Sequence, residues 1–126
     1  MKPRFAHEKG SIAEHAAERW LSRRGLKLIA RNFRCKNGEI DLIMRDAEYL
    51  VFIEVRLRSR SDYGDGAASV TLAKQRRLTR AAEQFLLSDT HWRHTPCRFD
   101  VLAGKPLAND SEFEWQWLRA AFCAAE

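Results

Sequence analysis

The sequence predicts a domain of the α/β (α+β) class, in which helices flank a mixed sheet. Two stretches with apolar residues at helical spacing, at about 11–24 and 69–87, stand on either side of a β-hairpin at 38–56. A further strand is expected at 98–103. A chain of 126 residues is long enough for one hydrophobic core, so we expect a single domain over 1–126.

The N-terminal part of the chain predicts a helix followed by a strand. Apolar side chains recur at helical spacing between residues 11 and 24, and Gly25 is placed to end the helix. The residues of this stripe are Ile12, Ala13, Ala16, Ala17, Trp20 and Leu21. Residues 26–33 are rich in aliphatic side chains without helical periodicity, so a strand is expected there.

The clearest pattern is the hairpin, with strands at 38–45 and 49–56 joined by a polar turn at 46–48. The alternating apolar residues of both strands must share one buried face, because a slip of one residue would turn one set away from the core. The register that satisfies both strands has the pairs Met44–Val51, Leu42–Ile53 and Ile40–Val55.

The same register places Asp41 directly opposite Glu54 on the other face of the hairpin. Directly opposed side chains have Cβ atoms about 4.5–5.5 Å apart, and two carboxylates so close repel each other unless a cation or a shared proton lies between them. Mg²⁺ suits such a pair, because it takes oxygen ligands and keeps waters beside one or two carboxylates. The spacing alone fits equally well a solvated strand end in which Arg56 pairs with Glu39.

Beyond the hairpin we expect a loop, a helix, two further strands and a short terminal helix. Residues 59–67 predict a mobile loop, 69–87 the second helix and 98–103 a strand. The alternation at 113–117 is typical of an edge strand, and an Ala-rich stretch after it predicts a short helix. The expected order is α-β-β-β-α-β with a C-terminal strand and short helix.

Asp100 alternates with Phe99 and Val101 in the strand expected at 98–103. Its carboxylate either points toward the paired acids or accepts a hydrogen bond from a backbone donor. We favour the structural role.

The net charge of +5 is unevenly distributed. Residues 1–34 carry a net charge of +6, 35–55 carry −3, 56–80 carry +5 and 81–126 carry −3. An acidic segment therefore lies between two basic ones. A cationic surface around a few carboxylates suits a metal-using enzyme that acts on a phosphate backbone; a solvated surface without a partner is the alternative.

Composition predicts a soluble, cytoplasmic protein without a membrane partner. No stretch approaches the roughly 18 uninterrupted apolar residues of a membrane helix, and residues 1–8 lack the apolar core of a signal peptide. The three cysteines are widely spaced and include no Cys-x-x-Cys pair, so reduced thiols are expected.

The segments G-E-I-D-L-I (38–43) and V-F-I-E-V-R-L-R (51–58) together resemble the YraN-like family of predicted endonucleases. That family belongs to the PD-(D/E)XK nuclease superfamily, which includes archaeal Holliday-junction resolvases and restriction enzymes. The likeness extends from about Gly10 through the second helix to Val101. It implies a restriction-endonuclease-like core.

By this resemblance, Asp41 and Glu54 match the metal-binding acidic pair, and Glu14 matches an acidic residue that the first helix contributes to the same site. Glu14 also fits a capping box with Ser11, in the pattern S-x-x-E, which gives it a structural alternative.

Arg56 departs from the family pattern, which has Lys two residues after the Glu. A lysine there can help position or deprotonate the attacking water, whereas arginine stays charged at any useful pH. Arg56 is therefore expected to hold the scissile phosphate and offset developing charge, without acting as a base. The expected catalytic residues are Glu14, Asp41, Glu54 and Arg56.

The second helix predicts a surface that contacts phosphates, because basic residues gather in its first half, where positive charge opposes the helix dipole. A charged, solvated face is the alternative. Gln75 resembles a position that orients the metal's water in some superfamily members. The expected nucleic-acid-binding residues are Arg58, Arg60, Lys74, Gln75, Arg76, Arg77 and Arg80.

The sequence therefore predicts a nucleic-acid-binding endonuclease that uses Mg²⁺ or Mn²⁺ to hydrolyse phosphodiester bonds. DNA is favoured over RNA, branched DNA is one expected substrate, and the resemblance to junction resolvases makes a homodimer plausible. One alternative is a nucleic-acid-binding module of the same fold whose catalysis has decayed, since Arg56 replaces Lys. Another is a protein-interaction domain that uses Trp115 and Trp117.

Overall fold

The computed structural model of this chain describes residues 4–58, 70–109 and 112–124, with residues 4–10 described by their backbone alone. Its helices are α1 (Arg4–Arg23), α2 (Leu72–Ser88) and the short 3₁₀ helix η2 (Thr90–Trp92). Its strands are β1 (Lys27–Cys35), β2 (Gly38–Asp46), β3 (Tyr49–Leu57), β4 (Cys97–Pro106) and β5 (Phe113–Phe122).

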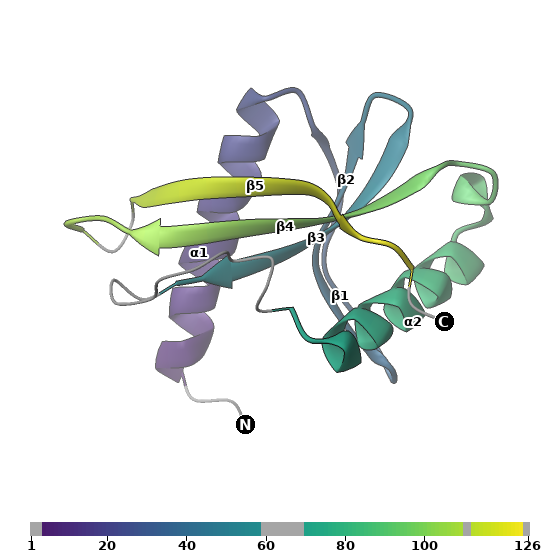
Figure 1. Ribbon diagram of the computed structural model, residues 1–126, viewed down its shortest axis with the longest axis horizontal. Coiled ribbons are helices and arrows are strands. Elements are labelled where there is room, and N and C mark those ends of the chain that lie inside the picture. Colours follow the sequence, from purple (N-terminus) through teal and green to yellow (C-terminus); the bar gives the residue numbers. More distant parts are fainter. Residues whose placement is uncertain (1–3, 59–69, 110–111, 125–126) are drawn as a thin grey trace.

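The five strands form one mixed sheet in the order β1-β2-β3-β4-β5 (Figure 1). Neighbouring strands are antiparallel except β3 and β4, which are parallel. A parallel pair needs a crossover connection, and α2 lies in this one. The predicted α+β class with helices flanking a mixed sheet is confirmed, and the arrangement is consistent with a restriction-endonuclease-like core.

Each face of the sheet is buried under one helix. Ala17 and Leu21 of α1 pack with Leu42, Met44 and other residues of one face. On the other face, residues of α2 pack in a second cluster whose members include Leu78, Ala81, Phe85, Ile43 and Phe52. The alternation of the hairpin therefore buries both of its faces, since helices cover the sheet from both sides.

The predicted position of Ile40 is wrong. The β2–β3 ladder runs from Asp46–Tyr49 to Leu42–Ile53 and includes no pair between Ile40 and Val55. Ile40 is fully buried in the cluster beneath α2, away from Leu42. Strict alternation fails here because the ladder with β3 stops at Leu42. The residues of β2 that precede Leu42 are unpaired with β3, and their side chains no longer follow its register.

The predicted C-terminal helix is also wrong, because β5 continues to Phe122. An irregularity in the β4–β5 ladder lies between Phe99 and Val101, and Ala120 has a left-handed φ of 48° at the matching place on β5. Phe122 stacks on Phe99 with ring centroids 5.0 Å apart. Pairing with β4 and this aromatic contact therefore override the helix preference of the alanines.

The structural role favoured for Asp100 is confirmed. Its carboxylate accepts hydrogen bonds from Arg98 Nε at 2.9 Å, Trp117 Nε1 at 2.9 Å and the Ala120 backbone N–H at 2.9 Å. The side chain has no exposed surface. Asp100 thus ties β4 to the irregular part of β5. The predicted loop at 59–67 lies outside the described residues.

Candidate functional site

Asp41 and Glu54 lie where β2 and β3 separate. The Asp41 carboxylate accepts a hydrogen bond from the Val55 backbone N–H at 2.8 Å through Oδ2. It supplies the acceptor that a strand carbonyl provides elsewhere in a ladder. This bond anchors one oxygen of Asp41, while Oδ1 takes no part in it.

An open pocket of about 540 Å³ contains both carboxylates. Its walls come from the β1–β2 hairpin and from α2, which meet closely: a Cβ added to Gly38 would lie 3.1 Å from the Arg77 carbonyl oxygen. The predicted convergence of Asp41 and Glu54 is confirmed, because both line this pocket. Their predicted direct opposition is wrong, since the β2–β3 ladder ends at Leu42–Ile53 and has no Asp41–Glu54 pair. The described lining residues are Arg34, Cys35, Lys36, Asn37, Gly38, Glu39, Asp41, Glu54, Lys74, Arg77 and Leu78.

Asp41 has a strongly shifted acidity. Burial, the charge of Glu54 and weaker contributions from Glu14 and Glu39 raise its pKa from 3.8 to about 8, although the hydrogen bond from Val55 opposes the shift. A carboxyl group in this environment stays protonated at neutral pH until a cation offsets its neighbours. The pocket is thus an acidic site that favours a bound positive charge.

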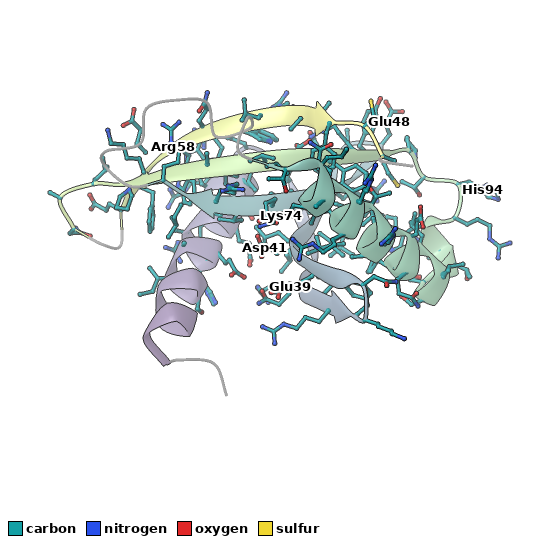
Figure 2. All side chains as sticks on the ribbon, turned by 60° about the horizontal axis from the view of Figure 1, so that its bottom comes forward. Glu39, Asp41, Glu48, Arg58, Lys74 and His94 are labelled. Carbon is teal, nitrogen blue, oxygen red and sulfur yellow. The ribbon has the colours of Figure 1, made fainter. Side chains whose placement is uncertain are left out.

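Glu54 is almost completely buried, with 8% of its side chain exposed, and pairs with a lysine of α2. Lys74 Nζ lies 2.7 Å from Glu54 Oε1. Figure 2 shows Lys74 beside Asp41 and Glu39, on the side of the sheet where α2 begins. The sequence placed Lys74 among phosphate contacts and did not foresee its contact with Glu54.

The remaining candidates of the acidic site lie at different places. Glu14, on α1, is close enough to influence Asp41 electrostatically. Arg56 is half-buried on β3 and is not among the described residues that line the pocket. Glu39 forms an ion pair with Arg34, with Arg34 Nε 3.6 Å from Glu39 Oε2.

The predicted phosphate-binding residues that the structure describes lie at different places. Arg77 lines the pocket, whereas Arg76 and Arg80 are exposed elsewhere on α2. The Gln75 side chain donates to the Val70 carbonyl at 3.1 Å. Arg58 lies apart from Asp41 in Figure 2, with Nη1 3.5 Å from Gln116 Oε1. Arg60 lies outside the described residues.

Sequence reasoning missed the contribution of the β1–β2 hairpin. Arg34 and Lys36 bring two cationic side chains to the rim, and Asn37 and Cys35 complete that wall. The signal available was the basic, polar turn R-C-K-N-G directly before the G-E-I-D segment. A turn that leads into a site-bearing strand is well placed to form one of its walls.

Asp41 and Glu54 are the carboxylates that could hold a metal, since the third carboxylate of the pocket, Glu39, pairs with Arg34. Within the described part of the chain, no group of three or more His, Cys, Asp or Glu side chains is arranged to hold an ion. Mg²⁺ binds through one or two carboxylates together with waters. Asp41 and Glu54 therefore fit such an ion, in a pocket whose carboxylates favour positive charge.

A mixed sheet with one helix on each face and two carboxylates at the opening between adjacent strands defines an α+β protein with a candidate cation site. The chain belongs to the UPF0102 family: the model of "Uncharacterised protein family UPF0102" matches residues 13–103. This confirms the YraN-like resemblance at the level of the family. No helix among the described residues has the length and apolar character needed to cross a membrane.

Relatives from several bacteria share this family name. A UPF0102 protein of Alcanivorax borkumensis is 48% identical over 113 residues, covering 90% of each chain. One from Nitrosospira multiformis is 48% identical over 115 residues, covering 90% of this chain and 92% of its own. A third, from Bordetella parapertussis, is 49% identical over 124 residues, covering 93% of this chain and 65% of its own.

Proposed function

We propose that this chain is a divalent-metal-dependent nuclease that hydrolyses phosphodiester bonds, with DNA favoured over RNA and branched DNA among its substrates. One observation carries the proposal: Asp41 and Glu54, from adjacent strands, line one pocket whose rim is cationic. Carboxylates that hold a metal beside basic groups that hold a phosphate are the two parts such a reaction needs. The resemblance to the PD-(D/E)XK superfamily supports the same reaction.

Asp41 and Glu54 would hold Mg²⁺ or Mn²⁺. When bound, such an ion supplies a water of lowered pKa and stabilises charge on the phosphate. The buried position of Glu54 and the bond from Val55 to Asp41 keep both carboxylates directed at the pocket. Because the orientation of both carboxylates is set before substrate arrives, neither carboxylate needs to turn to receive the ion.

The cationic residues at the pocket would hold the nucleic-acid backbone. Arg34, Lys36 and Arg77 contribute charge from the two sides of the opening. Glu14 would assist from α1, as the resemblance implies. Arg56 is not among the described residues that line the pocket. It would therefore act on the scissile phosphate only if the substrate extends past the pocket.

A nucleic-acid-binding module with decayed catalysis is the second candidate, and the ion pair of Glu54 with Lys74 favours it. An internal ammonium already neutralises one of the two metal-binding carboxylates. The protein-interaction alternative has less support, because Trp115 and Trp117 are half-buried on β5. Trp117 donates to Asp100 and packs edge-on against Trp20, and Trp115 packs over Gly104, so both tryptophans serve the fold.

Cleavage of a panel of linear, nicked, flapped and four-way-junction DNAs, with matching RNAs, tests the nuclease proposal. We expect products with Mg²⁺ or Mn²⁺, none with EDTA, and none from a Glu54→Gln variant of equal purity. The matched control is Glu114→Gln, because Glu114 is exposed on β5 outside the pocket. Binding without cleavage on every substrate would instead establish the decayed module.

Phosphate contacts by α2 predict that nucleic-acid affinity depends steeply on salt. Replacing Arg77 and Arg80 by Ala is expected to weaken binding equally for all sequences, since phosphates carry no base information. The slope of log affinity against log salt should fall by about 1 per contact removed. Fluorescence anisotropy at several salt concentrations measures it, with Arg93→Ala, exposed beside η2, as the control. An unchanged slope would move the interface away from α2.

A further inference from the structure

The ion pair between Lys74 and Glu54 joins α2 to the acidic pocket. Lys74 Nζ lies 2.7 Å from Glu54 Oε1, and 38% of the lysine side chain is exposed against 8% of the glutamate. The carboxylate is therefore fixed in the interior, whereas the ammonium reaches it from the solvent side. Of the two partners, Lys74 is the one that is free to move to another anion.

The backbone of Lys74 is held in place by the start of α2. Thr71 caps the helix, and its Oγ1 accepts a hydrogen bond from the Lys74 N–H at 3.2 Å. Lys74 thus lies in the first helical turn, where the helix dipole disfavours positive charge. Glu54 offsets this unfavourable placement, so the lysine is positioned by its partner in the pocket.

The ammonium of this site comes from α2 and not from β3. The residue two positions after Glu54 is Arg56, which does not line the pocket among the described residues, whereas Lys74 does. A lysine ammonium is a compact charge on a flexible four-carbon stem. It can therefore follow a nearby anion while the helix stays where it is.

We infer that Lys74 is the exchangeable cation of the site: it holds Glu54 while no divalent ion is bound, and a divalent ion displaces it onto the scissile phosphate. This inference rests on the proposed function. A divalent ion held by the Glu54 carboxylate would repel the ammonium that Lys74 Nζ places 2.7 Å from Glu54 Oε1. A phosphate bound at the pocket would offer the displaced ammonium another anion.

The role requires no proton transfer by Lys74. Its charge balances Glu54 in the empty pocket and the phosphate in the loaded one. Lys74 therefore lowers the affinity of the pocket for divalent ions and raises the rate of cleavage once they are bound. A residue that merely stabilises the fold has neither effect.

Mn²⁺ titration without nucleic acid tests the exchange. Wild type, Lys74→Met and Arg77→Met are compared by calorimetry, with circular dichroism to verify folding. We expect Lys74→Met to bind Mn²⁺ about 5- to 10-fold more tightly, the lower range of coupling between two ligands of one protein. Arg77→Met removes the same charge from the same pocket without touching the Glu54 pair, so it reports the general electrostatic effect, expected to be about twofold or less.

Unchanged or weaker Mn²⁺ binding by Lys74→Met would overturn the inference, and Lys74→Gln repeats the test should the methionine variant unfold. Lys74→Arg, which keeps the charge, should bind as wild type does. Single-turnover cleavage at saturating Mn²⁺ should fall about 10²-fold in Lys74→Met.

The two proposals fail differently. If wild type cleaves nucleic acid but Lys74→Met binds Mn²⁺ no more tightly than wild type, the exchange is rejected and the nuclease proposal stands. If Lys74→Met binds Mn²⁺ more tightly but neither wild type nor any variant cleaves, the nuclease proposal is rejected and the exchange stands. If no variant binds Mn²⁺, both are rejected.

Discussion

An Asp41→Asn variant is expected to lose cleavage by about 10³-fold or more, the scale of several kcal/mol that a bound metal contributes to charge stabilisation. Asn keeps an oxygen that can accept the hydrogen bond from Val55, so the local structure should persist. It lacks the negative charge that a divalent ion needs. Single-turnover rates on the best substrate of the panel measure the loss.

The same variant is expected to be more stable than wild type at alkaline pH. The pKa of Asp41 is raised to about 8 by burial and by Glu54, against 3.8 in the unfolded chain. Between these two values the folded protein holds a proton that the unfolded chain has released, so the free energy of unfolding falls as pH rises. The loss is absent below about pH 4 and complete above about pH 8.

Urea unfolding of wild type and Asp41→Asn between pH 4 and pH 9 measures this difference. We expect the two proteins to be close near pH 4, and the variant to be more stable by roughly 2–5 kcal/mol at pH 9. Adding Mg²⁺ at pH 9 should raise the stability of wild type and leave the variant unchanged. A constant difference across the whole pH range would show that Asp41 is not the titrating group.

Replacing Asp100 by Ala is expected to destabilise the protein by roughly 3–5 kcal/mol, as the loss of one partner from a buried ion pair does. The change leaves Trp117 Nε1 and the Ala120 N–H without their acceptor. It also removes one of the two carboxylates that hold Arg98.

The matched control is Asp46→Ala, which removes the other carboxylate from Arg98, at 2.8 Å, and leaves Asp100 in place. Because Asp46 is more exposed than Asp100, a loss of about 1 kcal/mol is expected. Urea unfolding at pH 7 compares the two. Equal losses would mean that the contacts of Asp100 with β5 contribute little.

The fold was predictable where periodicity and pairing agree. The hairpin register from Asp46–Tyr49 to Leu42–Ile53 follows from two sets of alternating apolar residues, and the structure has it. The prediction of the fold fails where a side chain replaces a backbone group as hydrogen-bond partner. Asp41 accepts the hydrogen bond of Val55 directly beside the end of the ladder, and Ile40 lies in the cluster beneath α2. The alternation of apolar and polar residues in the sequence does not indicate that a side chain will replace a backbone acceptor.

The site was predictable in its acidic half and less so in its basic half. The register predicted Asp41 and Glu54 close together on adjacent strands; the ladder ends one residue short of that pair, but both residues line the same pocket. Lys74 could not be assigned to Glu54, since the docking of α2 on the sheet depends on packing between distant parts of the chain. The pocket wall formed by Arg34 and Lys36 depends on how the β1–β2 hairpin bends toward α2.

The strand order β1-β2-β3-β4-β5 has a consequence for folding, since every strand pairs with its neighbour along the chain. The first three strands form a meander closed by short turns, which loses little loop entropy on closing. Only the β3–β4 pair needs a long crossover, the segment that carries α2. Asp41 and Glu54 therefore belong to the part assembled by local contacts, and Lys74 joins them when the crossover closes. Until α2 docks, the two acids therefore lack the ammonium of Lys74.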